Sequence, residues 1–435
     1  MMRRLYSLFM RGVQPLLRRK LRRRGAAEPG YLQAIEERFG YYATPAKPGA
    51  LWIHAVSLGE TRAAAILVDA LRQRDPSLRL LLTHGTATGR AEGERLLREG
   101  DVQAWLPWDT PQAVCRFLAH FRPCAGVLME TEVWPNLAHA CRRAGVPLAL
   151  ANARLSEKSL RQAQRLKRLA QPAYEALAAA WAQTEADAQR LRELRAPVNG
   201  VFGNLKFDAQ PDVELRARGR QWREALGGPV VAFASSREGE EAEFFRIVAA
   251  QRELDRAGWT RRDADRARVQ WLVVPRHPQR FDEVESLARS AGLSVSRRSA
   301  WGAEPEPADM WLGDSLGEMP LYYGLADVAL LGGSFLPLGG QNLIEAAACG
   351  CPVVMGPHTF NFAEPAERAQ EEGAALRVDS LEEGVRQAAE LARDAARRAH
   401  QAARAEAFAR AHRGAAARTA DAVLELVARS TRELR

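Results

Sequence analysis

At 435 residues the chain is longer than one hydrophobic core usually supports, and its 47% apolar content can fill two domains of about 200 residues each. The formal charge of +9 is confined to residues 1–24, which hold nine Arg or Lys and no Asp or Glu. Without these nine, 53 basic residues balance 53 acidic ones, which argues against a nucleic-acid face on the folded body. Five cysteines without paired metal-ligand spacing indicate a reducing compartment, and Cys349 and Cys351 are expected to be buried thiols.

Residues 1–24 have the pattern of an amphipathic helix. The chain has no apolar run long enough for a transmembrane helix, and the apolar core here is too short for a cleaved secretory signal. We expect this helix to lie in an anionic membrane interface with a kink at Pro15; the alternatives are packing on its own domain or a nucleic-acid arm. Four arginines (Arg4, Arg11, Arg18, Arg22) gather opposite an apolar side made of Met2, Leu5, Tyr6, Phe9, Met10, Val13, Leu16 and Leu17.

From Leu51 onward, short apolar runs alternate with helical patterns, which predicts βαβ units and therefore two α/β domains with parallel sheets. The pattern restarts after Gly203, which places the boundary near residues 203–212. Polar composition predicts surface loops at Arg252–Arg268 and Ser296–Asp309, and the tail from Ser380 is expected to be helical. The predicted strands are Leu51–Val56, Leu78–Thr83, Ala125–Met129, Pro147–Ala151, Val198–Phe202, Val230–Ala234, Val269–Val274, Met310–Leu312, Val328–Leu331 and Val353–Met355, with helices such as Thr61–Arg72 and Ala113–His120 between them.

The stretch 328–362 is the most informative part of the chain. It predicts a buried strand, a glycine loop over Leu336–Gly340, a helix and a second strand. Asn342 is a suitable N-cap, and Glu345 stands three residues later, as in a capping box. Such a loop brings backbone N–H groups and a helix N-terminus to the carboxyl edge of the sheet, which suits a phosphate or a nucleotide.

Polar clusters follow several predicted strands of the first domain, at the edge where ligands of such sheets bind. Ser57 and Gly59 form a tight turn that presents Glu60 at a helix start, where it is either a catalytic carboxylate or a first-turn residue that complements the helix dipole. The other clusters contain Glu130, Glu132, Asn152, Arg154 and Lys206, of which the last stands at the proposed hinge and is one of only five lysines.

In the second domain, Ser235 and Ser236 open a helix as an anion cradle, and Arg276 after Pro275 offers a guanidinium suited to phosphate. A cationic, glycine-lined pocket here and a carboxylate-lined one in the first domain suit transfer from a phosphorylated donor to an acceptor that needs a general base. Asp263 and Asp265 resemble a metal-binding pair, but no strand precedes them, and solvated charge is expected.

A series of motifs, in order from about residue 31 to 370, resembles the bacterial Kdo transferases, the 3-deoxy-D-manno-oct-2-ulosonic acid transferases of lipid A biosynthesis. Arg237 and Gln341 stand where some members carry histidines. The motifs are His54-Ala-Val-Ser-Leu-Gly-Glu60, Met129-Glu-Thr-Glu-Val-Trp-Pro-Asn136, Asn152-Ala-Arg-Leu-Ser156, Leu205-Lys-Phe-Asp208, Glu238-Gly-Glu-Glu241, Val274-Pro-Arg-His-Pro278 and Met355-Gly-Pro-His-Thr-Phe-Asn-Phe362.

The resemblance implies an α/β protein of the GT-B type, with two Rossmann-like parallel-sheet domains facing a cleft. Its parts would be a membrane-associating helix over residues 1–30, an acceptor domain over 31–207 and a CMP-Kdo domain over 208–435. The acceptor would be the lipid A precursor, lipid IVA, and residues 1–24 would hold the protein at the cytoplasmic face of the inner membrane. By resemblance Glu60 is the base, Glu130 and Lys206 assist the transition state, and the residues that hold CMP are Pro275, Arg276, Leu316, Gly317, Glu318, Asn342, Leu343, Ile344 and Glu345.

No metal or other cofactor is expected, because Arg276 and a helix terminus can stabilise the charge on the departing CMP. Two alternatives stay open: a GT-B glycosyltransferase that uses another nucleotide sugar, and a non-enzymatic protein that binds membranes through its basic arm. Protection against thermal unfolding by CMP rather than UDP would separate the first alternative from Kdo transfer. The second predicts that Glu60 is dispensable.

Overall fold

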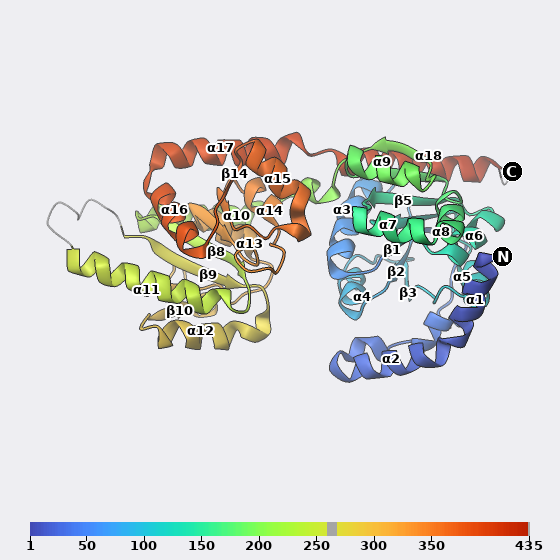
Figure 1. Cartoon of the computed structure of the whole chain (residues 1–435), viewed down its shortest axis with the longest axis horizontal. Coiled ribbons are helices and arrows are strands. Elements are labelled where there is room, and N and C mark those ends of the chain that lie inside the picture. The colour runs from blue at the N-terminus through green and yellow to red at the C-terminus, as the bar shows by residue number, and fades with distance from the viewer. Residues whose placement is uncertain (259–267, 434–435) are drawn as a thin grey trace. The chain divides into compact units, whose positions relative to one another are not determined.

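The computed structural model describes residues 1–258 and 268–433 and divides into two compact units, each built on its own parallel sheet (Figure 1). The first unit comprises Met1–Asp208 together with the segment from Arg413 onward, and the second comprises Ala209–His412. The pair of Rossmann-like sheets confirms the predicted α/β class. Asp263 and Asp265, for which solvated charge was expected, lie outside the described residues.

The first unit contains a seven-stranded sheet in which every neighbouring pair of strands is parallel. Its strands follow the spatial order β3 (Val102–Trp105), β2 (Leu80–His84), β1 (Leu51–Ala55), β4 (Ala125–Met129), β5 (Leu148–Ala153), β6 (Ala179–Ala182) and β7 (Val198–Val201). The helices are α1 (Met2–Gly12), α2 (Gln14–Ala27), α3 (Leu58–Arg74), α4 (Ala87–Glu94), α5 (Pro111–Phe121), α6 (Pro135–Arg143), α7 (Glu157–Arg165), α8 (Lys167–Tyr174), α9 (Glu185–Glu193) and α18 (Ala415–Glu433), with 3₁₀ turns η1 (Pro29–Leu32), η2 (Ile35–Phe39) and η3 (Leu205–Asp208).

Side chains of β1 are buried on both faces, which explains why the strand reads as an unbroken apolar run. Trp52 packs into the core beneath α5, α6 and α9, whereas Leu51 and Ile53 pack into the core beneath α3 and α18. Helices therefore cover both faces, and the polar residues that follow each strand collect at the carboxyl edge.

The second unit repeats this plan with another seven-stranded parallel sheet. Its strands follow the order β10 (Val295–Arg297), β11 (Met310–Leu312), β9 (Gln270–Pro275), β8 (Val230–Ser236), β12 (Val328–Leu331), β13 (Val353–Met355) and β14 (Ala375–Arg377). The helices are α10 (Val213–Leu226), α11 (Glu240–Gly258), α12 (Phe281–Ser290), α13 (Met319–Leu325), α14 (Leu343–Ala348), α15 (Ala363–Glu371), α16 (Leu381–Arg393) and α17 (Ala395–Ala411), with 3₁₀ turns η5 (Pro278–Arg280), η6 (Arg298–Ala300) and η7 (Phe360–Phe362).

The C-terminal helix α18 corrects the predicted domain plan, which assigned all of 208–435 to the second domain. Ala420 and Val423 of α18 belong to the core beneath α3, and Figure 1 shows this red helix among the elements of the first unit. The carboxylate of Asp208 accepts hydrogen bonds from the N–H groups of Gly414 at 2.5 Å and Ala416 at 2.7 Å. Asp208 therefore satisfies backbone donors at the start of α18, which would otherwise lack a partner.

The basic N-terminus forms two helices, because α1 ends at Gly12 and Pro15 occupies the first turn of α2. The break between the two helices therefore falls at Val13, two residues before the Pro15 at which a kink was expected. Leu21 is buried in a small cluster with Tyr31 and Phe39, so α2 is packed on the body of the unit. On α1, by contrast, the side chains of Leu5, Leu8 and Phe9 are 55%, 67% and 65% exposed. The apolar residues of this N-terminal segment are thus partly packed on the unit and partly exposed to solvent.

Several boundaries differ from the predicted ones. Strands β3, β6, β10 and β14 were absent from the prediction, and the expected loop after Ser296 contains part of β10. The predicted insertion beginning at Arg252 instead continues α11 as far as Gly258. At Asn342 the N-cap is confirmed, and its side-chain oxygen accepts from the N–H of Ile344 at 3.1 Å.

Candidate active site

Glu60 lies in the first turn of α3, immediately after the carboxyl end of β1. Its carboxylate accepts a hydrogen bond from the N–H of Val56 at 2.8 Å and another from the hydroxyl of Ser57 at 3.1 Å. The Ser57 oxygen in turn accepts from the N–H of Glu60 at 3.4 Å, as in a capping box. Glu60 is therefore a first-turn carboxylate of α3, as in the alternative role considered from the sequence.

Burial raises the pKa of Glu60 to about 7, from an ordinary value of 4.5. The hydrogen bond from Val56 opposes this rise, whereas the negative charges of Glu130 and Glu132 add to it. A pKa close to neutrality lets Glu60 accept a proton and release it again, which is a property that a general base requires.

Glu130 stands directly after β4 with a left-handed backbone, at a φ of +61°. Lys206, from η3, places its ammonium nitrogen 3.5 Å from Glu130 Oε1. Because Glu130 also contributes to the raised pKa of Glu60, these three predicted residues belong to one electrostatic cluster. The strained backbone at Glu130 is a feature often found at functional sites.

Asn152 holds this cluster together from β5. It also has a left-handed φ, of +51°, and its side-chain oxygen accepts from the N–H of Leu205 at 3.0 Å. That bond fixes the start of η3 and thereby positions the neighbouring Lys206. The Nδ2 atom of Asn152 is buried without a hydrogen-bond partner among the described residues. The side-chain oxygen of Asn152 is therefore used within the fold, and the contact to substrate that the sequence suggested stays a prediction.

Three further candidates of the first unit differ in their surroundings. Burial raises the pKa of Glu132, while a hydrogen bond with Trp134 opposes the rise. The side chain of Arg154 is exposed, although its backbone N–H donates to the carbonyl of Glu130 at 3.1 Å. Gly59 lies exposed on the first turn of α3.

In the second unit, Glu240 organises the strand ends, although no individual role was predicted for this residue. Its buried carboxylate accepts from the N–H groups of Gly333 at 2.7 Å, Phe335 at 3.2 Å and Arg237 at 3.0 Å. These three N–H groups are therefore already bonded to Glu240. Fewer backbone donors are left for an anion in the cradle expected after β8 and in the glycine loop expected after β12. The motif Glu238-Gly-Glu-Glu241 was the available signal for this role.

The donor candidates lie at the carboxyl ends of adjacent strands of the second sheet. Ser235, with a left-handed φ of +56°, and the buried Ser236 end β8, and the exposed Arg276 follows Pro275 of β9. The N–H of Arg276 donates to the carbonyl of Ser236 at 3.0 Å, which ties the two strand ends together. The pKa of His277 is lowered, first by burial and then by nearby arginines including Arg237 and Arg276. Arginines and the carboxylate of Glu238 therefore stand close together at this edge.

The remaining donor candidates lie between β11 and α13 and at the start of α14. Leu316 is 76% exposed, and Gly317 has a positive φ of +82°. Glu318 accepts from Arg298 at 2.9 Å and from the Ser315 hydroxyl. Leu343 and Ile344 are buried in the first turn of α14, and the side chains of Asn342 and Glu345 are half-buried.

Within residues 1–258 and 268–433, no helix is both long and apolar enough to span a bilayer. In the same ranges, no three side chains among His, Cys, Asp and Glu are arranged to hold a metal ion.

Residues 33–209 match the family model described as 3-Deoxy-D-manno-octulosonic-acid transferase (kdotransferase). A 3-deoxy-D-manno-octulosonic acid transferase of Bordetella pertussis is 48% identical over 96% of this chain and 98% of the relative. The transferase of Haemophilus influenzae is 32% identical over 88% of this chain and 89% of its own length. A solved glycosyltransferase from Rickettsia africae, 11% identical, superposes on 88% of this chain and 99% of its own with a TM-score of 0.56, which shows a likeness of fold.

Near-complete coverage at 48% identity, together with the motif residues gathered at two strand edges, removes the non-enzymatic interpretation. The two Rossmann-like sheets agree with the GT-B type that the motifs implied. The chain therefore belongs to the family of Kdo transferases, glycosyltransferases that act in lipopolysaccharide biosynthesis.

Proposed function

We propose that this enzyme transfers Kdo from CMP-Kdo to a hydroxyl group of the lipid A precursor, lipid IVA, with inversion at the anomeric carbon. In this reaction the acceptor oxygen forms a bond to the anomeric carbon, the bond from that carbon to the phosphate oxygen breaks, and CMP departs. The acceptor hydroxyl must lose its proton as it attacks. Glu60 takes this proton.

The environment of Glu60 carries the proposal. Its carboxylate is fixed by Val56 and Ser57, and burial raises its pKa to about 7. A base with this pKa is mostly ionised slightly above neutrality and is still basic enough to accept a proton in the transition state. Lys206, paired with Glu130 at 3.5 Å, supplies a positive charge in the same cluster for the carboxylate of the donor sugar.

CMP is expected to bind at the strand edge of the second unit. Arg276 is exposed there directly after β9, and its backbone N–H is bonded to the end of β8. A guanidinium can form two parallel hydrogen bonds to a phosphate and can stabilise the charge that develops on it. On this chemical ground we propose that the transfer requires neither a metal ion nor another cofactor.

The enzyme is expected to associate peripherally with the cytoplasmic face of the inner membrane, where a lipid acceptor would be available. The support is α1, which exposes Leu5, Leu8 and Phe9 next to several arginines. Apolar side chains of this kind enter the interfacial layer, and neighbouring cations are attracted to anionic headgroups.

Mass spectrometry of the product tests the proposal as a whole. The enzyme is incubated with lipid IVA and with CMP-Kdo generated in the same reaction. The proposal predicts a lipid product heavier by Kdo and formation of CMP, and CMP but not UDP should raise the melting temperature. A product only with another nucleotide sugar would refute the assignment of the donor.

A further inference from the structure

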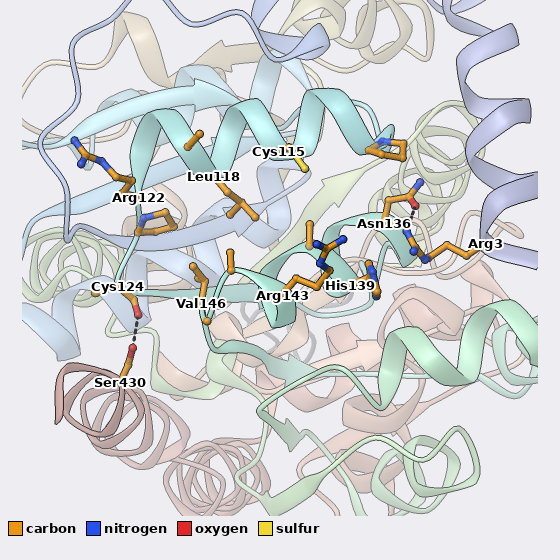
Figure 2. A pocket seen from close by; sticks show the side chains of 16 residues that line it. Arg3, Cys115, Leu118, Arg122, Cys124, Asn136, His139, Arg143, Val146 and Ser430 are labelled. Atoms are coloured by element: carbon orange, nitrogen blue, oxygen red, sulfur yellow. Dashed lines mark hydrogen bonds between the residues drawn. The ribbon is translucent and has the colours of Figure 1, made fainter. Parts of the chain in front are cut away.

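Outside the strand edge, the first unit contains a groove of about 590 Å³ that runs between α5 and α6 (Figure 2). This volume lies within the range of about 300–1,000 Å³ that is usual for small-molecule sites. Figure 2 shows Cys115 and Leu118 on one wall, His139 and Arg143 on the other, and Cys124 and Val146 at the far end. Glu60, Glu130 and Glu132 do not line it, so the groove is distinct from the candidate active site.

The walls combine small apolar side chains with positive charges. Ala119, Ala140 and Val146 leave an open apolar channel, while the positive charges of Arg3, Arg122 and Arg143 stand along it together with the imidazole of His139. Among the 16 described residues that line the groove there is no Asp or Glu, although acidic residues are as frequent as basic ones in the body of the chain. An apolar channel with only positive charge beside it suits an amphiphile that has a negative headgroup.

Arg3, Arg143 and His139 lie toward the part of the groove that meets α1, whereas Arg122 stands at the opposite end (Figure 2). Arg3 of α1 donates to the side-chain oxygen of Asn136 at 3.3 Å, and Ser7 donates to the same atom at 2.9 Å. These bonds fix α1 at the start of α6 and hold Arg3 at the groove. Arg3 and Arg143 both lower the pKa of His139, after a larger effect of burial, so the three side chains share one neighbourhood.

The same helix points to the source of the amphiphile. Leu5, Leu8 and Phe9 of α1 expose more than half of their side-chain surface, on the helix that also carries Arg3. If these side chains enter the interfacial layer of a membrane, the charged end of the groove stands at the level of the lipid phosphates. The occupant would therefore come directly from the bilayer.

We propose that the groove between α5 and α6 binds one anionic membrane phospholipid, with an acyl chain between the helices and the phosphate at Arg3, Arg143 and His139. The bound lipid would fix the orientation of the first unit on the membrane. This role is additional to Kdo transfer and does not depend on how the acceptor binds.

Cys115 provides a direct measurement, because it is an exposed free thiol that lines the groove. In a Cys124→Ser variant the other cysteines, Cys141, Cys349 and Cys351, are buried. The rate at which N-ethylmaleimide modifies Cys115 is measured with short-chain phosphatidylglycerol or phosphatidylcholine, each below its micelle concentration so that no membrane surface shields the thiol. Inorganic phosphate alone serves as a third probe.

The proposal predicts saturable protection of Cys115 by phosphatidylglycerol, at least about tenfold tighter than by phosphatidylcholine, because charged hydrogen bonds distinguish the two headgroups. Inorganic phosphate should not protect. In an Arg3→Gln, Arg143→Gln variant the preference for phosphatidylglycerol should disappear, while an Arg122→Gln variant should keep it. An Ala119→Phe change at an exposed position of the wall should abolish protection without lowering the melting temperature.

Three results would overturn the proposal. The first is no protection by phosphatidylglycerol in the folded protein. The second is equal protection by both phospholipids, which would indicate an apolar groove without a phosphate site. The third is protection by the lipid A precursor but not by phosphatidylglycerol, which would make the groove part of the acceptor site.

Discussion

The ammonium nitrogen of Lys206 lies 3.5 Å from Oε1 of Glu130, and both side chains are largely buried. Glu130 is one of the charges that raise the pKa of Glu60. The positive charge of Lys206 therefore offsets part of the negative potential at the proposed base. This pair connects a residue from η3 with the loop after β4, and its effect on Glu60 can be measured.

Replacing Lys206 with Met should lower kcat/KM at least about tenfold and move the acidic limb of its pH profile upward. Without the ammonium group, Glu130 repels an ionised Glu60 more strongly, so the pKa of Glu60 rises. Lys158→Met, at an exposed position on α7, is the matched control and should leave both quantities unchanged. If the acidic limb stayed in place in Lys206→Met, the charge of Lys206 would have no effect on the pKa of the base.

In the wild-type enzyme, kcat/KM should increase with pH through about pH 7. Glu60 acts only when ionised, and burial raises its pKa to about 7, so the active fraction increases tenfold per pH unit below that value and levels off above it. Initial rates from pH 5.5 to 8.5 at low acceptor concentration give this profile. A nearly flat profile over this range, which a glutamate with the ordinary pKa of 4.5 would give, would contradict the assignment.

Arg276→Ala should weaken the binding of CMP by roughly 1.5–3 kcal/mol, the range for a hydrogen bond to a charged group. Calorimetric titration with CMP measures this change directly. Arg246→Ala removes an exposed arginine of the same unit that pairs with Glu243, and it should bind CMP like the wild type. If Arg276→Ala bound CMP with wild-type affinity, Arg276 would not contact the phosphate, and the phosphate site would lie at another part of the strand edge.

Substituting Leu5, Leu8 and Phe9 with Gln should reduce binding to anionic vesicles at least about tenfold. Fully burying one such side chain contributes about 1.5–3 kcal/mol, so partial burial of all three in the membrane interface is enough for this loss. Deleting residues 1–24 would be less informative, since Leu21 is part of the packed core. Vesicle co-sedimentation measures the effect, and an unchanged melting temperature confirms folding. A triple Gln variant at the exposed Leu166, Val213 and Leu226 is the control. Equal losses in both variants would refute a specific role for α1.

The sequence predicted the parts of the site whose partners are close in the chain. Ser57 and Glu60 share one turn, and their positions after an apolar strand indicated the sheet edge. The role of Asp208 was missed because the N–H groups it binds belong to Gly414 and Ala416, about half the chain away. Local pattern carries no signal for such a contact.

The same limit applies to Glu240, which holds Gly333 and Phe335 across the second unit. Its sequence position predicts a first-turn carboxylate, and only the fold shows that it occupies N–H groups that were expected to bind a ligand. Short strands were missed for a different reason. β6 is the four-residue run Ala179–Ala182, whose alanines favour helix in isolation and form a strand here because both neighbours are strands.

Glu60→Gln separates catalysis from capping, because glutamine keeps the shape of the side chain and loses the basic site. If Glu60 were only a first-turn carboxylate, the change would cost about 0.3–1 kcal/mol of stability and leave turnover intact. Because the pKa of Glu60 is about 7 in the folded protein and 4.5 in the unfolded chain, ionising this group lowers the free energy of unfolding as pH rises through this range, by up to roughly 3 kcal/mol. At pH 8 the glutamine variant should therefore be at least as stable as the wild type.

The most direct test is the rate of Kdo transfer to lipid IVA by Glu60→Gln, measured by mass spectrometry beside urea unfolding at pH 8. The account predicts a fall in turnover of at least about 10²-fold, the usual effect of losing a general base, with no loss of unfolding free energy. Near-wild-type turnover together with lower stability would contradict the assignment of Glu60 as the base. Glu60 would then be only a first-turn carboxylate that stabilises the start of α3.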